Sequence, residues 1–175
     1  MTLNAPKSRR GTAVRAGFLV AVITLILDQV SKHWILDWVK LTEDSAPIVL
    51  APFAEFKFVW NRGISYGLFQ QGTDFGRWLL VGISIAAAIA LIVWLLRVEK
   101  RLVGIAIGFI IAGAIGNAID RAVYGAVIDF IYVHFAILPF WRYVFNIADA
   151  AIVAGVAGLL YDSVLQGRQS RGNMP

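Results

Sequence analysis

Two aspartates lie where the chain is otherwise apolar, and their side chains could act together as an acid and a base. Asp129 lies in the run GAVIDFIYV, and Asp149 lies in FNIADAAIV. If the two carboxyl groups meet, they cannot both ionise comfortably, so one of them keeps its proton. The ionised group can then take a proton from water, while the protonated group polarises a carbonyl. This is the chemistry of aspartic proteases, and it requires neither a metal nor a cysteine.

Each aspartate also has a structural alternative. Asp149 could make a hydrogen bond between packed helices, and Asp129 could cap an interfacial helix. Asn146 lies three residues before Asp149 on the same helical face, and it could either bridge two helices or orient a site. An ionisable group inside a membrane-spanning segment is costly, however, and is by default a functional hypothesis. We therefore take Asp129 and Asp149 as the catalytic candidates.

Further polar residues lie near the ends of apolar segments and could support such a site. Asp28 and Lys32 are spaced i, i+4, so they can pair on one helical face, either as a plain salt bridge or as part of a site. Asn61 begins Asn61-Arg62-Gly63, a sequence typical of a turn, so Asn61 is either a turn former or a site residue. The sequence leaves both alternatives open for these residues.

The motif N-A-I-D-R at 117–121 ends another apolar segment. Asn117 is the one strongly polar residue within that segment, from 102 to 119. Asp120 and Arg121 could form an ion pair at the membrane interface, or they could join the same site as the two aspartates.

The composition excludes most other classes of protein. Of the 175 residues, 59% are apolar and 15% charged, whereas a soluble domain carries roughly a quarter charged residues. With no cysteine and two histidines, the chain can form neither a disulfide nor a multi-histidine metal site. It has no H-E-x-x-H, G-x-S-x-G or phosphate-loop motif. We therefore expect an integral membrane protein without a metal or cofactor, and the scattered basic clusters predict no nucleic-acid partner.

Four segments are long and apolar enough to cross a membrane as helices: 16–35, 78–96, 102–119 and 143–161. We expect a single integral membrane domain over 1–175, because no repeat or low-complexity linker divides the chain. The dense basic cluster of Arg97, Lys100 and Arg101 predicts that the loop between the second and third spans is cytoplasmic. Both termini are then cytoplasmic as well.

The two connections on the opposite side of the membrane carry their own patterns. Residues 47–69 include alternating Phe56, Phe58 and Trp60, which predicts a small antiparallel β element on the membrane surface. Residues 130–141 are too short for a further span, and we expect a short interfacial helix there. Small residues recur every four positions from 104 to 116, which predicts close packing of the third helix against its neighbours.

Four motifs together resemble a known family. They are D-Q-V-S-K at 28–32, N-R-G-I-S-Y-G at 61–67, G-N-A-I-D-R at 116–121 continuing to G-A-V-I-D-F-I at 125–131, and F-N-I-A-D-A-A-I at 145–152. Each motif alone is weak, but all four occur in order on spans of the right polarity. They resemble the motifs of lipoprotein signal peptidase, or signal peptidase II, a bacterial membrane aspartic protease family.

The resemblance implies an activity and a set of site residues. It implies a catalytic dyad of Asp129 and Asp149, and a substrate-binding or supporting set of Asp28, Lys32, Asn61, Gly63, Asn117, Arg121 and Asn146. The implied substrate is a diacylglyceryl-modified prolipoprotein, cut just before the lipidated cysteine, and the implied inhibitor is globomycin. The implied location is the bacterial cytoplasmic (inner) membrane, with membrane lipids around a monomer and the active site near the outer leaflet.

The second motif departs from the family pattern, because Arg62, Ser65 and Tyr66 replace residues that are more often small, small and phenylalanine. Two rival functions remain. A proton-coupled transporter also uses carboxylates within the membrane, but it needs polar residues at all depths, whereas these lie toward one side. A structural subunit would not need a pair of buried acids.

Overall fold

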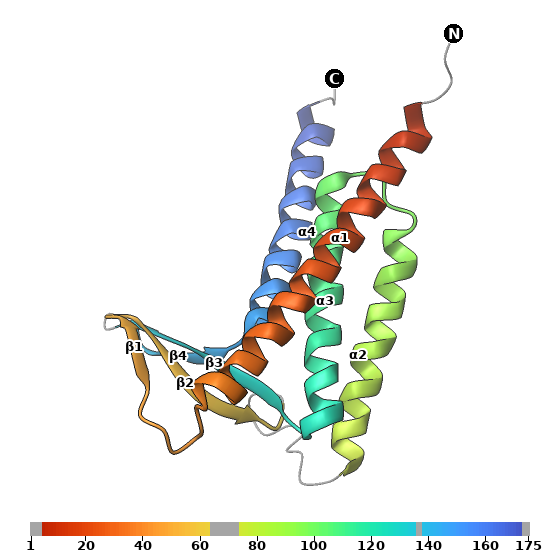
Figure 1. Cartoon of the computed structure of the whole chain (residues 1–175). Helices are drawn as coiled ribbons and strands as arrows, with labels where there is room; N and C mark the ends of the chain where they lie inside the picture. Colours follow the sequence, from red (N-terminus) through yellow and green to blue (C-terminus); the bar gives the residue numbers. More distant parts are fainter. Residues whose placement is uncertain (1–4, 64–73, 136–137, 173–175) are drawn as a thin grey trace.

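The computed structural model describes residues 5–63, 74–135 and 138–172. Within these residues, four long helices form a bundle, and one four-stranded sheet extends sideways from one end of it (Figure 1). The helices are α1 (Ala5–His33), α2 (Asp74–Leu95), α3 (Arg101–Tyr124) and α4 (Ile147–Gly172). The strands are β1 (Ile48–Ala51), β2 (Ala54–Asn61), β3 (Val127–Phe135) and β4 (Leu138–Phe145).

All four helices contain a segment long and apolar enough to span a membrane, within Arg9–Val39, Asp74–Leu95, Arg101–Tyr124 and Ile147–Gln166. The first segment includes a π-helical continuation of α1, η1 (Trp34–Val39), which ends where Lys40 adopts a left-handed conformation with φ of 56°. The chain therefore has the fold class that its sequence predicts, a helical membrane protein of four spans with a small β element.

Helix α3 is the centre of the bundle, because it packs against α1, α2 and α4. Its small residues allow the close approach that their four-residue spacing predicts. A Cβ atom on Gly104 would lie 2.5 Å from the carbonyl oxygen of Ala13, and a Cβ on Gly108 would overlap that of Gly17. Glycine at these positions lets the α1 and α3 backbones touch, which larger side chains would prevent.

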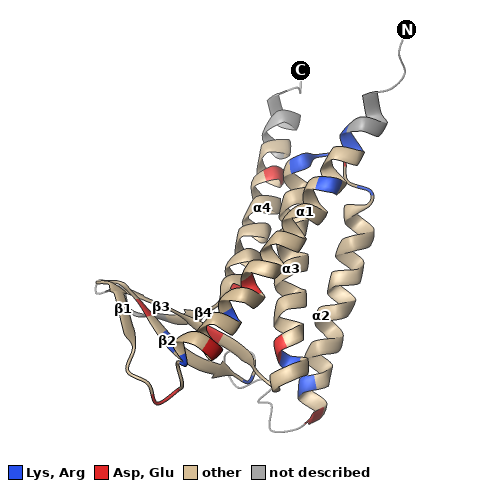
Figure 2. Cartoon of the chain, viewed as in Figure 1, with Lys and Arg blue, Asp and Glu red and all other residues tan. Residues whose placement is uncertain are grey.

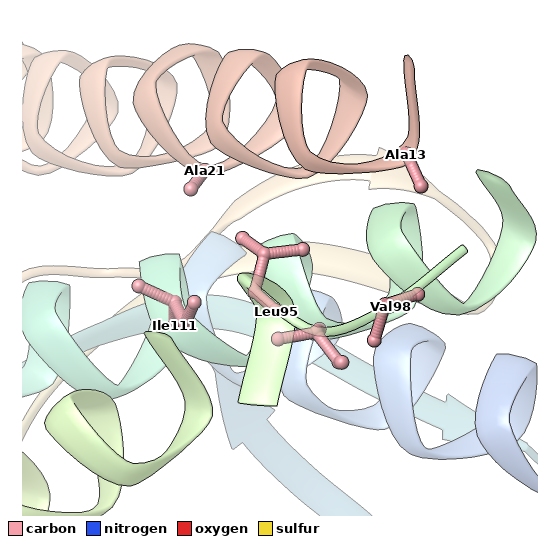
Figure 3. Close-up of a cluster of buried hydrophobic side chains, with 6 residues drawn as sticks. Ala13, Ala21, Leu95, Val98 and Ile111 are labelled. Carbon is pink, nitrogen blue, oxygen red and sulfur yellow. The ribbon is translucent and has the colours of Figure 1, made fainter. Parts of the chain in front are cut away.

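An apolar cluster holds the bundle together at the end where the chain termini lie (Figure 3). Ala13 and Ala21 of α1 face Leu95 and Val98 near the α2–α3 turn, with Ile111 of α3 beside Leu95. A second cluster joins η1 to the sheet through Ile35, Leu41, Phe58, Ile128 and Phe130. The sheet is therefore anchored on the helices and is not a detached flap.

The strands run antiparallel in the order β1-β2-β3-β4. Val59 pairs with Asp129, Trp60 with Ile128, and Asn61 with Val127. β1 and β2 form the described part of the β element expected at 47–69, whereas residues 64–69 of that element, with Ser65 and Tyr66, lie outside the described residues.

The short helix expected at 130–141 is wrong, because the described residues of this segment belong to β3 and β4. The sequence VIDFIYVHF in β3 is rich in β-branched and aromatic residues, which favour a strand where a partner is available. β2 supplies that partner along one side of β3, and β4 pairs along the other. As a consequence, α4 begins only at Ile147, later than the predicted span, and Asp149 lies in its first turn.

Charged residues are distributed unevenly along the bundle (Figure 2). Basic residues predominate at the end that carries the chain termini, where α4 also carries Asp162, and acidic residues and further basic residues lie toward the sheet end. Between the two ends, α2 has no charged residue from Trp78 to Leu95. The polar groups with candidate roles therefore gather at the sheet end.

Candidate active site

Asp129 enters the site from β3 because of the turn that follows α3. The helix ends at Tyr124, and Gly125 turns the chain with a left-handed φ of 80°, a conformation that glycine adopts without strain. Arg77 of α2 closes the end of α3 by donating from Nε to the carbonyl oxygen of Arg121 at 2.7 Å. Helix α2 thus holds the end of α3, and with it the α3–β3 turn, in place.

Asn61 holds one oxygen of Asp129. Its Nδ2 donates to Asp129 Oδ2 at 3.0 Å, while its Oδ1 accepts a hydrogen bond from the backbone N–H of Gly63 at 3.2 Å. Because Asn61 pairs with Val127, two residues before Asp129, the two polar side chains share one face of the sheet. Asn61 is therefore both the turn former and the site neighbour that its sequence left as alternatives.

Asn146 holds the other oxygen of Asp129 and also caps α4. Its Oδ1 accepts a hydrogen bond from the backbone N–H of Asp149 at 2.9 Å, as helix-capping side chains do. Its Nδ2 therefore points away from α4, and it donates to Asp129 Oδ1 at 2.7 Å. One fully buried side chain thus connects the backbone of one aspartate with the carboxylate of the other.

Asn117 of α3 holds Asp149. Its Nδ2 donates to Asp149 Oδ1 at 2.8 Å, and its Oδ1 accepts hydrogen bonds from Asn146 and Lys32. Three asparagine amide groups therefore point their N–H bonds at the two aspartates. This arrangement brings together residues of β2, α3, β3 and α4, far apart in the sequence.

Asp129 is 2% exposed, and its burial together with the negative charge of Asp149 raises its pKa from 3.8 to about 7. Hydrogen bonds from Asn61 and Asn146 and the charge of Lys32 act in the opposite direction. A carboxyl group with a pKa near neutrality can exchange its proton readily at physiological pH. The two aspartates lie close enough to influence each other, as acid–base chemistry with a shared proton requires.

Arg121 of α3 is near enough for its charge to interact with Asp129 and Asp149. Its Nη1 donates to the carbonyl oxygen of Asn117 at 3.4 Å. Its Nε is buried and has no hydrogen-bond partner among the described residues. A buried unpaired N–H group is costly, so this atom is suited to donate to a group that arrives with a bound molecule.

Beneath the aspartates lies a buried ionic cluster. Lys32 Nζ lies 2.8 Å from Asp28 Oδ2 and 2.8 Å from Asp120 Oδ2, and none of the three residues is more than 1% exposed. The i, i+4 pair of Asp28 and Lys32 thus forms, but as part of a larger cluster. The alternative of an Asp120–Arg121 ion pair at the membrane interface is wrong, because Asp120 is buried and pairs with Lys32.

Sequence reasoning did not single out Gln29 and left the role of Asp120 undecided. The Nε2 of Gln29 donates to Asp28 Oδ2 and to Asp120 Oδ1, both at 3.1 Å. A polar residue beside Asp28 in an apolar segment was the available signal for Gln29. Among the described residues, no group of three or more potential ligands is placed to hold a metal ion.

The comparisons with known proteins identify the family. A family model described as Signal peptidase (SPase) II matches residues 20–165. The chain belongs to the lipoprotein signal peptidase family. It is 56% identical to the lipoprotein signal peptidase of Methylorubrum extorquens (strain PA1), over 87% of this chain and 88% of the relative. It is 55% identical to the lipoprotein signal peptidase of Methylobacterium radiotolerans, over 93% of this chain and 94% of the relative.

Solved structures agree with this family. A bacterial membrane enzyme determined by the in meso method at 2.3 Å resolution superimposes with a TM-score of 0.74 and 27% identity, covering 91% of this chain and 93% of that enzyme. A second bacterial membrane enzyme, determined by the same method at 1.9 Å resolution, superimposes with a TM-score of 0.70 and 29% identity. This match covers 83% of this chain and 90% of that enzyme. As a member of the lipoprotein signal peptidase family, the chain is a multi-pass membrane protease of the aspartic type that cleaves signal peptides from prolipoproteins.

Proposed function

We propose that Asp129 and Asp149 are the catalytic dyad, and that they hydrolyse the peptide bond just before the lipidated cysteine of a diacylglyceryl-modified prolipoprotein. The observation that carries the proposal is the set of asparagine N–H groups on both carboxylates, two on Asp129 and one on Asp149. Such preorganised donors hold the two carboxyl groups in one geometry before the substrate binds.

The reaction needs one proton shared by the pair. The ionised carboxylate takes a proton from water, and the resulting hydroxide attacks the carbonyl carbon of the scissile bond. The other carboxyl group donates its proton to the carbonyl oxygen, which gives a neutral tetrahedral intermediate. When the intermediate collapses, the carboxylate that had given up its proton takes one from a hydroxyl group of the intermediate. The C–N bond breaks, and the other carboxyl group passes its proton to the leaving nitrogen of the cysteine, so that the pair again holds one proton. The apparent pKa values then belong to the pair and not to one residue.

The neighbouring residues have supporting roles in this proposal. Asn61, Asn117 and Asn146 orient the dyad, with Gly63 fixing the amide of Asn61. Arg121 donates its unpaired Nε to a carbonyl oxygen of the bound substrate. Globomycin, the inhibitor implied by the family resemblance, would occupy the same site and compete with the substrate.

The proposed topology places the dyad near the outer leaflet of the bacterial cytoplasmic (inner) membrane. The basic cluster between α2 and α3 supports cytoplasmic termini, and the dyad lies at the opposite, sheet end of the bundle. There the acyl chains of a substrate stay in hydrocarbon while water reaches the scissile bond. The substrate thus enters sideways from the bilayer, and the chain works as a monomeric single domain.

The decisive experiment is the processing of a synthetic diacylglyceryl-modified precursor by the purified full-length protein. Asp129→Asn and Asp149→Asn should each lower turnover by at least about 10³-fold, because one carboxyl group cannot supply both proton transfers. Asp162→Asn is the matched control, since Asp162 is buried at the opposite end of the bundle, and this variant should keep its turnover. Wild-type turnover in either dyad variant would contradict the assignment.

The same assay with an unlipidated precursor tests the substrate class. We expect poor cleavage of that precursor, because it lacks the acyl chains that hold the substrate in the bilayer beside the site. Equal rates for both precursors would contradict lateral entry but would leave the dyad assignment intact.

A further inference from the structure

We infer that Lys32 is a positioning residue that sets the placement of both dyad aspartates through two buried carboxylates, Asp28 and Asp120. The inference rests on the proposed dyad and deepens it, because it assigns a purpose to a charged cluster that does not face the reacting bond. Lys32 and Asp28 come from α1 and Asp120 comes from α3, so the cluster joins two helices.

The ammonium group of Lys32 is fully committed to buried acceptors. It lies 2.8 Å from one oxygen of Asp28, 2.8 Å from one oxygen of Asp120, and 3.3 Å from Asn117 Oδ1. Two of its N–H groups donate to Asp28 and Asn117, and its charge also lies at ion-pair distance from Asp120. Gln29 closes the cluster by donating to both carboxylates.

Each of the two carboxylates also holds the backbone directly before one dyad aspartate. Asp28 Oδ1 accepts a hydrogen bond from the backbone N–H of Ala148 at 2.9 Å, the residue before Asp149. Asp120 Oδ2 accepts one from the backbone N–H of Ile128 at 3.2 Å, the residue before Asp129. One lysine thus ties together the first turn of α4 and the start of β3, the two segments that must meet for the dyad to form.

Lys32 also fixes the side chain that holds Asp149. An ammonium group can only donate, so the oxygen of the Asn117 amide must face Lys32. The Nδ2 of Asn117 is thereby turned toward Asp149 Oδ1, to which it donates at 2.8 Å. Without Lys32, the hydrogen bond from Asn146 Nδ2 at 3.2 Å would be the remaining contact of the described residues that holds the amide in this orientation.

Stability alone is a weak explanation for this cluster. It buries one positive and two negative charges, and replacing a buried ionic cluster with apolar side chains is often neutral or stabilising. The cluster instead places its bonds on the residues adjacent to the dyad. Loss of such positioning lowers the rate of the chemical step, whereas loss of a mere structural contact lowers stability.

The test compares kcat, KM and Tm of purified full-length variants with the diacylglyceryl-modified precursor. Lys32→Met/Asp120→Asn removes one charge of each sign and leaves Asp28 bonded to Ala148. We expect kcat to fall about 100-fold with KM changed less than about threefold, because a small displacement of reacting groups costs that much. Asp120→Asn alone removes the excess negative charge, so it should keep its Tm and still lose about tenfold in kcat.

Lys100→Met is the matched control, because Lys100 also pairs with a buried aspartate, Asp162, but at the opposite end of the bundle. It should keep the wild-type kcat. Wild-type kcat in both cluster variants would overturn the inference. If the double variant does not fold, the kcat of Asp120→Asn alone is the test, and a wild-type value there would overturn the inference. Asp129→Asn in the same assay separates the two proposals: if it retains turnover, the dyad itself is wrong and the inference falls with it.

Discussion

At the scale of single residues, the site depends on which way its asparagine amides face. Each of the three amide oxygens accepts a hydrogen bond that fixes its orientation. The oxygen of Asn61 accepts from the backbone N–H of Gly63, that of Asn146 from the backbone N–H of Asp149, and that of Asn117 from Lys32 and Asn146. Each NH₂ group is then directed at an aspartate. At Asp129, the N–H donors favour the ionised form of the carboxyl group, and burial opposes it.

This balance predicts how stability depends on pH. The pKa of Asp129 is raised from 3.8 to about 7 by burial and by Asp149, so the folded chain binds this proton more tightly than the unfolded chain does. Such a group stabilises the fold at low pH, and its contribution is lost as the pH rises through the folded-state pKa. Because Asp129→Asn cannot lose a proton, its Tm relative to wild type should increase between about pH 5 and pH 8, by an amount equivalent to a few kcal/mol at most.

The measurement is the Tm of both proteins in the same detergent across that pH range. Asp44→Asn, at an exposed aspartate, provides the control and should leave the difference from wild type constant. A constant difference for Asp129→Asn would mean that its carboxyl group is not perturbed in the fold.

At the scale of elements, the start of α4 and the crossing of α1 with α3 decide the geometry. Asn146 ends β4 and begins α4, which places Asp149 in the first helical turn beside Asp129. Close packing along α3 then brings Asp28 against Gly116, where a Cβ atom would lie 2.5 Å from Asp28 Oδ2. The glycines of α3 thus position polar residues of the site as well as apolar ones.

The packing of α1 against α3 yields a prediction with a built-in control. Gly108→Ala adds a Cβ that overlaps the carbonyl oxygen of Gly17, so we expect it to destabilise the protein by about 1–3 kcal/mol. Gly82→Ala, in α2, adds a Cβ with nothing within 4 Å, so it should be neutral or stabilising by up to about 1 kcal/mol. Thermal unfolding of both variants in detergent checks this, and equal Tm changes would contradict the close crossing.

At the scale of the whole molecule, the protein is a polar site at one end of an apolar bundle. The sheet is anchored beside that site by the cluster of Ile35, Phe58 and Phe130, and α3 runs from the basic end to the dyad. The arrangement separates an end that carries the termini from an end that carries the proposed chemistry (Figure 2). It explains how a small chain can bring water and a lipid-anchored peptide to the same place.

The proposed orientation is testable because the chain has no cysteine of its own. Asp44→Cys lies in the connection before β1 and Glu99→Cys in the α2–α3 connection, and both positions are exposed. A membrane-impermeant maleimide added to intact spheroplasts should label position 44 and not position 99. After the membrane is permeabilised, both should react. Labelling of position 99 and not of position 44 in intact spheroplasts would show the opposite topology, with the chain termini outside the cytoplasm.

The sequence by itself determined the class of the protein, its four spans and its family. These follow from local properties: long apolar runs must be helices in lipid, and the four motifs carry the family's polar residues in order. It also indicated Asp129 and Asp149 as the candidate pair, because charged groups in apolar segments are rare. It did not predict β3 and β4 at 130–141, since a short apolar segment fits a helix or a strand until its partner is known.

Only the tertiary structure decided how the polar residues are connected. From the sequence, an ion pair between Asp120 and the adjacent Arg121 was one alternative, but Asp120 pairs with Lys32 on another helix. Gln29 stands out in the sequence as a polar residue in an apolar segment, but its hydrogen bonds to carboxylates of two different helices are visible only in the fold. The physical reason is that hydrogen bonds and ion pairs depend on distances between elements, which are set when α1, α3 and α4 pack together. Composition reveals that a buried charge needs a partner, and only the fold reveals which partner it has.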